Sequence, residues 1–260
     1  MFFRVEGSGE PLLAIHGFPT SSWDWALVWP ALTARYRVLA CDMLGFGFSA
    51  KPAHGTYSIA HQADLQEALL AGHGVTSYRL LAHDYGLTVA QELLARGANI
   101  RGACLLNGGL FPETHRPVLT QQLLASPVGR VIARLSSYPT FRRTMKGIWG
   151  GTPPSDGETR AMWALINEHD GMRVMPKLIG YMAERRRYRE RWVGALVETK
   201  TPIRLIDGID DPISGAHMVA RYRELVPNAD IVELPGVGHY PQVEAPAAVQ
   251  AAVLEFMARC

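Results

Sequence analysis

The chain has 260 residues, of which 48% are hydrophobic, so it can bury the core of one large α/β domain. Its formal net charge of +2 gives no electrostatic basis for binding nucleic acid. Cys41, Cys104 and Cys260 have neither metal nor redox spacing, and no segment is apolar and long enough for a signal peptide or a membrane span, so we expect a cytoplasmic protein with no membrane partner.

The first 110 residues alternate between strand and helix patterns. The expected strands are residues 12–16, 36–40, 78–82 and 102–106, and the expected helices are residues 22–32, 59–70 and 88–95. Ser22 is the expected N-cap of the first of these helices. Such alternation predicts a mostly parallel sheet that is flanked by helices on both faces.

This alternation stops between residues 111 and 200, where helical patterns are interrupted by prolines and no strand is expected. Arginines concentrate between Arg185 and Arg191, a run that is typical of a solvent-exposed helix face. The alternation then resumes with strands at residues 203–207 and 230–234 and helices at residues 216–225 and 247–257. A structureless connection of this length would be unusual. We therefore predict an α/β core of residues 1–110 and 201–260 with an inserted helical cap of residues 111–200.

An unusual turn follows the expected strand at residues 78–82. Strand, sharp turn and helix is how an α/β fold presents a catalytic nucleophile, normally a serine with glycines two residues to either side. Here the flanking residues are Ala82 and Gly86, and the residue at the tip is Asp84. A carboxylate has a reference pKa of about 4, so it is ionised near neutral pH without help from a base. Asp84 is therefore a candidate nucleophile; the alternative is an aspartate that caps the following helix.

Three further polar segments follow expected strands. They are His16-Gly17-Phe18-Pro19, Gly208-Ile209-Asp210-Asp211-Pro212 and Gly236-Val237-Gly238-His239-Tyr240. The carboxyl ends of parallel strands meet at one edge of the sheet, and the order nucleophile, acid, histidine is that of α/β-hydrolases. We therefore expect Asp84, His239 and one of the two neighbouring aspartates to lie together.

The chain resembles the α/β-hydrolase superfamily over nearly its full length. Within it, the HGFP segment, the Gly45-Phe46-Gly47-Phe48-Ser49 loop and the elbow at Asp84 resemble the epoxide hydrolase and haloalkane dehalogenase branch. The stretches HDYGLTVAQELL and LLNGGLFPETHRP are similar in particular to the mesoderm-specific transcript protein-like hydrolases. In this branch an aspartate attacks a substrate carbon, and a histidine oriented by a second carboxylate activates water to hydrolyse the resulting alkyl ester.

The resemblance implies a role for each of the polar residues. Asp84 would be the nucleophile and His239 the base. The family pattern places the acid three residues after a glycine, which is Asp211, with Asp210 as the alternative; Asn107, where some relatives have the acid, is an amide. The backbone N–H groups of Phe18 and Tyr85 would form the oxyanion hole.

The leaving group separates the two activities of this branch. Haloalkane dehalogenases hold the halide with an Asn in the HGxP loop and a Trp after the nucleophile, and this chain has Phe18 and Tyr85 there. Epoxide hydrolases use two cap tyrosines to protonate the departing oxygen. Tyr181 lies at the interval expected of one of them and Tyr138 is a candidate for the other, although cap tyrosines also serve as packing residues.

These residues predict a cofactor-independent and metal-independent hydrolase with an Asp-His-Asp triad, most consistent with opening an epoxide to a diol. Its ligands would be a small apolar organic substrate and water. The alternatives are a haloalkane dehalogenase, a non-catalytic binding protein on the same fold, and a cofactor-free oxygenase similar to coelenterazine luciferases. Monomer and homodimer both stay open.

Overall fold

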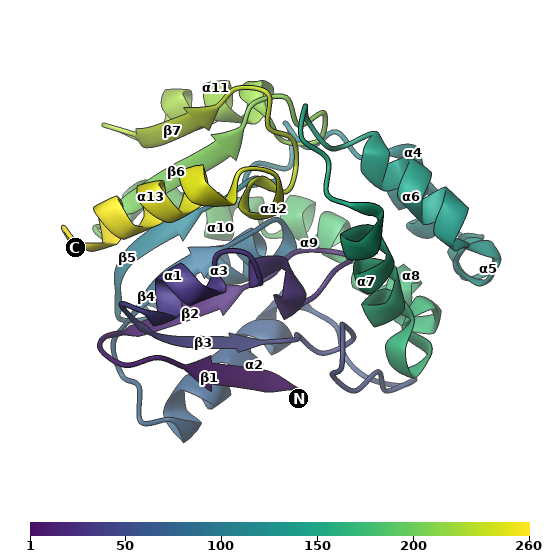
Figure 1. Ribbon diagram of the computed structural model, residues 1–260, viewed down its shortest axis with the longest axis horizontal. Helices are drawn as coiled ribbons and strands as arrows, with labels where there is room; N and C mark the ends of the chain where they lie inside the picture. The colour runs from purple at the N-terminus through teal and green to yellow at the C-terminus, as the bar shows by residue number, and fades with distance from the viewer.

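A seven-stranded sheet with the order β1-β3-β2-β4-β5-β6-β7 forms the centre of the computed structural model, which describes residues 1–260 (Figure 1). The strands are β1 Phe3–Glu6, β2 Pro11–Ile15, β3 Arg37–Cys41, β4 Tyr78–Ala82, β5 Ile100–Leu105, β6 Ile203–Gly208 and β7 Asp230–Leu234. All neighbours are parallel except β1, an unpredicted edge strand that pairs antiparallel with β3. In the register of the central strands, Leu13 lies between Leu39 and Leu80.

Helices cover the sheet and fill the segment between β5 and β6. The helices of the core are η1 Ser22–Trp25, α1 Trp29–Thr33, α2 Ile59–Gly72, α3 Tyr85–Ala95, α11 Ala216–Leu225, α12 Pro241–Glu244 and α13 Pro246–Met257. The other helices are α4 Leu119–Leu124, α5 Gly129–Leu135, α6 Tyr138–Lys146, α7 Asp156–Asn167, η2 Glu168–Val174, α8 Met175–Leu178, α9 Tyr181–Arg187 and α10 Arg189–Glu198. None of these helices combines the length and the apolar character that a membrane crossing requires.

The strands alternate their side chains between two apolar layers, as a pleated sheet requires. Leu13 and Ile15 of β2 belong to the layer that contains α2, α3, α10 and α11. Leu12 and Ala14 belong to the layer that contains α1 and α13, which cross the front of the sheet in Figure 1. Because both faces are covered, the central strands are apolar at nearly every position.

The first predicted helix is wrong in its bounds and in its cap. Residues 22–32 form the short 3₁₀ helix η1 and then α1 rather than one helix. Pro30 lies in the first turn of α1, a position that proline favours because it has no N–H to donate. Ser21, not Ser22, accepts the capping hydrogen bond, from the N–H of Trp23.

We call residues 111–200 the cap segment. Its regular elements are all helices, and several of these helices lie over the strand ends. Figure 1 shows α4 to α8 grouped at one side of the sheet, where α4, α6 and α7 share a cavity with loops that follow β2, β6 and β7. The last helix, α10, lies instead against α3 and contributes Trp192 and Leu196 to the core layer there. The cap segment is therefore anchored in the core at its C-terminal end.

Glu92 of α3 forms the polar part of this anchor. Its carboxylate accepts hydrogen bonds from Trp192 Nε1 at 2.7 Å, from Arg191 Nε at 2.9 Å and from Arg96 Nε at 2.9 Å. Burial raises the pKa of Glu92, but these hydrogen bonds outweigh burial and lower the pKa to about 2. Glu92 therefore binds α10 to α3 as a carboxylate.

Glu92→Gln should lower the free energy of unfolding at pH 7 by about 2 kcal/mol, a typical contribution of hydrogen bonds to a charged group. The folded pKa lies below the ordinary value of 4.5, so the stabilisation is present above that pH and is lost as the pH falls towards 2. Urea unfolding across this range should show the wild type losing more stability in acid than the variant. Glu190→Gln, on the exposed face of α10, is the control, and equal acid sensitivity of Glu92→Gln and wild type would contradict the prediction.

Candidate active site

The turn between β4 and α3 presents Asp84 at its tip. Asp84 has φ 44° and ψ −105°, a conformation that is uncommon for a residue with a side chain. The N–H of Asp84 donates to the carbonyl of Asn107 at 2.8 Å, which holds the turn against the loop after β5. A Cβ on Gly86 would lie 2.5 Å from the carbonyl oxygen of Ile15, so only glycine allows α3 to start this close to β2. α3 begins at Tyr85, three residues before the predicted start.

The two carboxylate oxygens of Asp84 have different surroundings. Oδ2 accepts a hydrogen bond from the N–H of Phe18 at 3.0 Å. Oδ1 is buried without a hydrogen-bond partner. The side chain makes no capping hydrogen bond to α3, so the alternative of a capping aspartate is wrong. Of the two expected oxyanion-hole donors, Phe18 is in contact with the carboxylate, whereas no hydrogen bond joins the carboxylate to the N–H of Tyr85, which is one of the unpaired amides in the first turn of α3.

His239 lies between two carboxylates. Its Nδ1 donates to Asp211 Oδ2 at 2.7 Å, and its Nε2 lies 3.8 Å from the free Oδ1 of Asp84. Asp211 Oδ1 also accepts from the N–H of Ile213 at 2.8 Å, and its Oδ2 accepts from Ser214 Oγ at 2.7 Å. These bonds orient the imidazole so that Nε2 faces Asp84. Asp210 is exposed, and so of the two adjacent aspartates it is Asp211 that contacts the histidine.

Opposed charges set the protonation of these three groups. Burial lowers the pKa of His239, but Asp211 and then Asp84 outweigh burial and raise it to about 9. Burial raises the pKa of Asp84, but the charges of His239 and Arg185 and the N–H of Phe18 bring it below its ordinary value. Asp211 behaves in the same way, chiefly through His239. At neutral pH the site therefore holds two carboxylates and an imidazolium.

Asn107 cannot act as an acid, but it joins the two catalytic loops. Its Nδ2 donates to the carbonyl of Gly208 at 2.9 Å and to Asp211 Oδ2 at 3.2 Å, and its Oδ1 accepts from the N–H of Gly208 at 2.7 Å. Its own carbonyl accepts from Asp84. The amide thus fixes the distance between the elbow and the loop after β6, a role that sequence reasoning missed.

Glu244 holds the histidine loop. Its carboxylate accepts three backbone N–H groups, from Gly150 at 2.6 Å and from Gly238 and Tyr240 at 3.0 Å. Gly150 belongs to the cap segment, so one side chain links that segment to the loop on both sides of His239. His83 also holds this loop, because its Nε2 donates to the carbonyl of His239 at 2.7 Å.

Arg185 is the functional candidate that sequence reasoning missed. The run from Arg185 to Arg191 was expected to be a solvated helix face, and this is wrong for Arg185, which is 2% exposed. Its Nε donates to Thr88 Oγ1 at 2.7 Å, its Nη2 donates to the carbonyl of Asp84 at 3.1 Å, and Nη2 lies 4.0 Å from Asp84 Oδ1. The useful signal was its spacing: four residues after Tyr181, Arg185 lies on the same helix face as that tyrosine.

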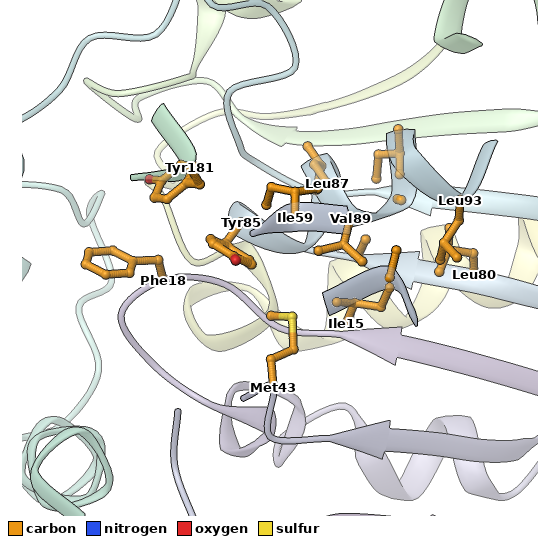
Figure 2. Packing of buried hydrophobic residues seen from close by; sticks show 14 of the residues in the cluster. Ile15, Phe18, Met43, Ile59, Leu80, Tyr85, Leu87, Val89, Leu93 and Tyr181 are labelled. Atoms are coloured by element: carbon orange, nitrogen blue, oxygen red, sulfur yellow. The ribbon is translucent and has the colours of Figure 1, made fainter. Parts of the chain in front are cut away.

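The two cap tyrosines have opposite positions. Tyr181 is fully buried, with its hydroxyl unpaired and its ring 4.5 Å from the Arg185 guanidinium. Figure 2 shows the rings of Phe18, Tyr85 and Tyr181 grouped beyond the end of β2, and the Tyr181 ring lies 5.0 Å from that of Tyr85 and 5.9 Å from that of Phe18. Tyr138 instead donates to Asp156 Oδ1 at 2.6 Å on the outer surface, so its expected contact with substrate is wrong.

A mainly apolar cavity reaches His239 from the cap segment. Its core residues follow β2, β6 and β7, and the rest come from α4, α6, α7 and their neighbours. The lining comprises Phe18, Pro19, Val118, Thr120, Gln121, Leu124, Ser136, Thr140, Phe141, Thr144, Met145, Ile148, Trp163, Ile166, Met172, Met175, Ile213 and His239. The cavity has a volume of about 80 Å³. No cluster of His, Cys, Asp and Glu side chains is arranged to hold a metal ion.

Known proteins share both the sequence and the fold of this chain. The model of the family described as "Alpha/beta hydrolase family" matches residues 12–252. The human mesoderm-specific transcript homolog protein is 44% identical over 257 residues, which cover 93% of this chain and 77% of that protein.

Two solved structures are similar in fold. Haloalkane dehalogenase DbeA from Bradyrhizobium elkani USDA94 has a TM-score of 0.83 at 25% identity, covering 98% of this chain and 93% of that chain. Epoxide hydrolase CorEH has a TM-score of 0.81 at 20% identity, covering 99% and 94%, a likeness of fold alone. The mostly parallel sheet, its flanking helices and these matches agree, and the chain belongs to the alpha/beta hydrolase family and has its fold.

Proposed function

We propose that this protein is a cofactor-independent hydrolase that opens small apolar epoxides to diols through an alkyl ester on Asp84. The observation that carries the proposal is the asymmetry of the Asp84 carboxylate. The N–H of Phe18 holds Oδ2, while Oδ1 is buried, unpaired and 3.8 Å from His239 Nε2. An aspartate nucleophile suits attack on an epoxide carbon better than attack on an ester carbonyl. Attack on an ester would give an anhydride.

In the proposed first step, Asp84 Oδ1 attacks one carbon of the epoxide. The bond from that carbon to the ring oxygen breaks, and its electron pair stays on the oxygen, which takes the proton of the Tyr181 hydroxyl. The products are an alkyl ester on Asp84 and a phenolate on Tyr181. Ester formation removes the Asp84 charge that had raised the pKa of His239, so the imidazolium releases its proton and Tyr181 is restored.

In the proposed second step, neutral His239 removes a proton from water, and the water oxygen adds to the ester carbonyl carbon. The N–H of Phe18 then donates to the developing oxyanion. The intermediate expels the diol oxygen, which takes the proton from His239. Asp84 passes its remaining carboxyl proton back to His239, and the initial ion pair returns.

The side chains beside the nucleophile favour an epoxide over a haloalkane. Phe18 has no polar group to hold a halide, and the hydroxyl of Tyr85 is directed to the carbonyl of Tyr57 at 3.4 Å. Tyr181, whose buried hydroxyl has no partner and whose ring lies against the Arg185 guanidinium beside Asp84, is the proposed donor to the departing epoxide oxygen. The likeness to haloalkane dehalogenase DbeA keeps halide displacement as the second candidate, and release of halide from chloroalkanes and bromoalkanes would distinguish it.

His239→Gln should trap the ester, because water is no longer activated. Intact-protein mass after incubation with a panel of epoxides and haloalkanes should increase by the mass of one epoxide, or by the mass of one haloalkane less that of the hydrogen halide, and peptide mapping should place the addition on Asp84. The control His239→Gln/Asp84→Asn should show no addition. If the panel labels a trapped epoxide hydrolase but not this variant, the chain instead fits a binding protein on the same fold.

Tyr181→Phe should slow ester formation from an epoxide by about 10²-fold, the usual scale for loss of a general acid. Tyr138→Phe is the matched control, because Tyr138 belongs to the same cap segment but bonds to Asp156 outside the cavity, and its rate should equal that of the wild type. The measurement is single-turnover ester formation in the His239→Gln background. Equal rates in both variants would remove Tyr181 from the mechanism.

The decay of the ester should depend on pH with a midpoint below that of His239 in the free protein. Asp211 and Asp84 raise the pKa of free His239 to about 9 against burial, and esterification removes the Asp84 charge. Because hydrolysis needs neutral His239, the decay rate should rise with pH and level off above the lowered pKa. Quenched mass spectrometry would follow the decay and NMR would titrate free His239. The same midpoint in both experiments would contradict this coupling.

A further inference from the structure

Arg185 places a permanent positive charge beside the proposed nucleophile. Its guanidinium is fixed by Thr88 Oγ1 and by the carbonyl of Asp84, and it stacks on the ring of Tyr181 at 4.5 Å. Its Nη2 is 4.0 Å from Asp84 Oδ1, the oxygen that would attack. A guanidinium does not lose its proton in proteins, so this charge stays throughout a reaction.

Polar atoms without partners gather around this guanidinium. Arg185 Nη1, the Tyr181 hydroxyl, Asp84 Oδ1 and both ring nitrogens of His115 are buried and unpaired. A Cβ on Gly109 would lie 2.4 Å from Arg185 Nη1 and 2.9 Å from His115 Nδ1, so the glycine lets both groups approach the same point. Buried polar atoms are nearly always paired in folded proteins, and this cluster therefore indicates a place where a ligand atom supplies the missing partner.

The charges of the four groups that face the nucleophile and the base balance only when Arg185 is counted, because the nearby Glu244 carboxylate is already held by three backbone N–H groups. Asp84 and Asp211 carry two negative charges, and protonated His239 and Arg185 carry two positive charges. Burial lowers the pKa of the two other histidines, to about 4 for His83 and to about 3 for His115, so both are neutral. After ester formation and loss of the His239 proton, Asp211 and Arg185 remain as one charge of each sign. The balance holds at both stages for an uncharged substrate and fails for an anionic one.

We propose, building on the proposed function, that Arg185 is a catalytic residue of ester formation that stabilises the negative charge as it moves from Asp84 to the departing substrate oxygen, and that it restricts the site to uncharged substrates. When Oδ1 attacks carbon, its charge passes to the ring oxygen before the Tyr181 proton arrives. Arg185 lies beside both the oxygen that loses the charge and the phenol that then neutralises it. A fixed guanidinium in a site without bulk water is effective for this, since no solvent must reorient.

The geometry favours this role over recognition of a carboxylate on the substrate. A second fixed anion in the site would face Asp84 and Asp211, and the existing positive charges are already matched by these two residues. Buried charge without a counter-charge is costly. The apolar lining of the adjoining cavity agrees with an uncharged substrate.

The test is single-turnover ester formation in the His239→Gln background with glycidamide, an uncharged epoxide, and glycidate, its carboxylate counterpart of similar size. With Arg185 intact, glycidamide should form the ester and glycidate should react at least about 10-fold more slowly, the factor for the loss of roughly 1.4 kcal/mol. Arg185→Met should slow the glycidamide reaction about 10²-fold, the scale for removing one charge-stabilising donor. Arg185→Lys, which keeps the charge without the fork, should recover part of that loss.

The rate of ester hydrolysis distinguishes a catalytic role of Arg185 from a structural defect, because a structural defect would slow hydrolysis as well as ester formation. In the His239-containing protein, Arg185→Met should alter ester decay far less than ester formation, whereas misplacement of the whole site would slow both. Arg186→Met, on the exposed face of α9, is the matched control and should change neither step. Thermal unfolding checks the fold of each variant, and Arg185→Gln, which keeps hydrogen-bond donors but loses the charge, decides the question if Arg185→Met does not fold.

Three results would overturn the proposal. Undiminished ester formation in Arg185→Met, or in Arg185→Gln where that variant replaces it, would remove Arg185 from the reaction and leave the proposed function intact. Glycidate reacting as fast as glycidamide would reassign Arg185 to carboxylate recognition. No ester with any epoxide in His239→Gln, with Arg185 present, would refute the proposed function and the role of Arg185 together.

Discussion

A carboxylate that is only 1% exposed must be kept ionised, and the rest of this site is built around that constraint. Burial alone would favour the neutral acid, which cannot attack carbon. The backbone N–H of Phe18, the imidazolium of His239 and the guanidinium of Arg185 oppose burial from three directions. Each of these partners comes from a different part of the chain, so the ionised state of Asp84 depends on the whole fold.

The parallel sheet brings these partners together, because the loops that carry them follow neighbouring strands. Parallel strands end at one edge, and the loops after β2, β4, β6 and β7 bring Phe18, Asp84, Asp211 and His239 together there. The strained backbone of Asp84 points its side chain out of the turn, and the hydrogen bond to Asn107 holds the turn in place. The sheet and its loops therefore hold these four residues in place without a ligand.

Local signals explain which parts of the structure could be predicted from sequence. β4 and β7 have the expected bounds because each is a short, mainly apolar run that ends at turn residues. The partnership of Asp211 with His239 followed from motif order and a resemblance. The split of residues 22–32 depends on Pro30, because proline has no N–H to continue the hydrogen bonds of the preceding turn.

The tyrosines and arginines of the cap segment could not be assigned by the same means. Whether a helical tyrosine faces the site or the surface depends on how the helix rotates against the core, and that separates Tyr181 from Tyr138. Composition did not distinguish Arg185, because the exposed arginines Arg186, Arg187 and Arg191 of the same run have the same side chain. A position four residues from a candidate catalytic residue is a better guide than a charge run, since it states which side chains share a face.

One helix, α9, carries both Tyr181 and Arg185, and α10 follows it directly with a strong attachment to α3. The part of the cap segment nearest Asp84 is thus held by the core, while α4, α6 and α7, which provide half of the residues that line the cavity, are not held by Glu92. This arrangement separates two functions within one insertion. Tyr181 and Arg185 are fixed relative to Asp84, whereas the wall of the cavity is bonded to the histidine loop, because the N–H of His239 donates to the carbonyl of Ile148 at 2.9 Å. A sequence change in the cavity wall therefore reaches His239 more directly than it reaches Tyr181 and Arg185.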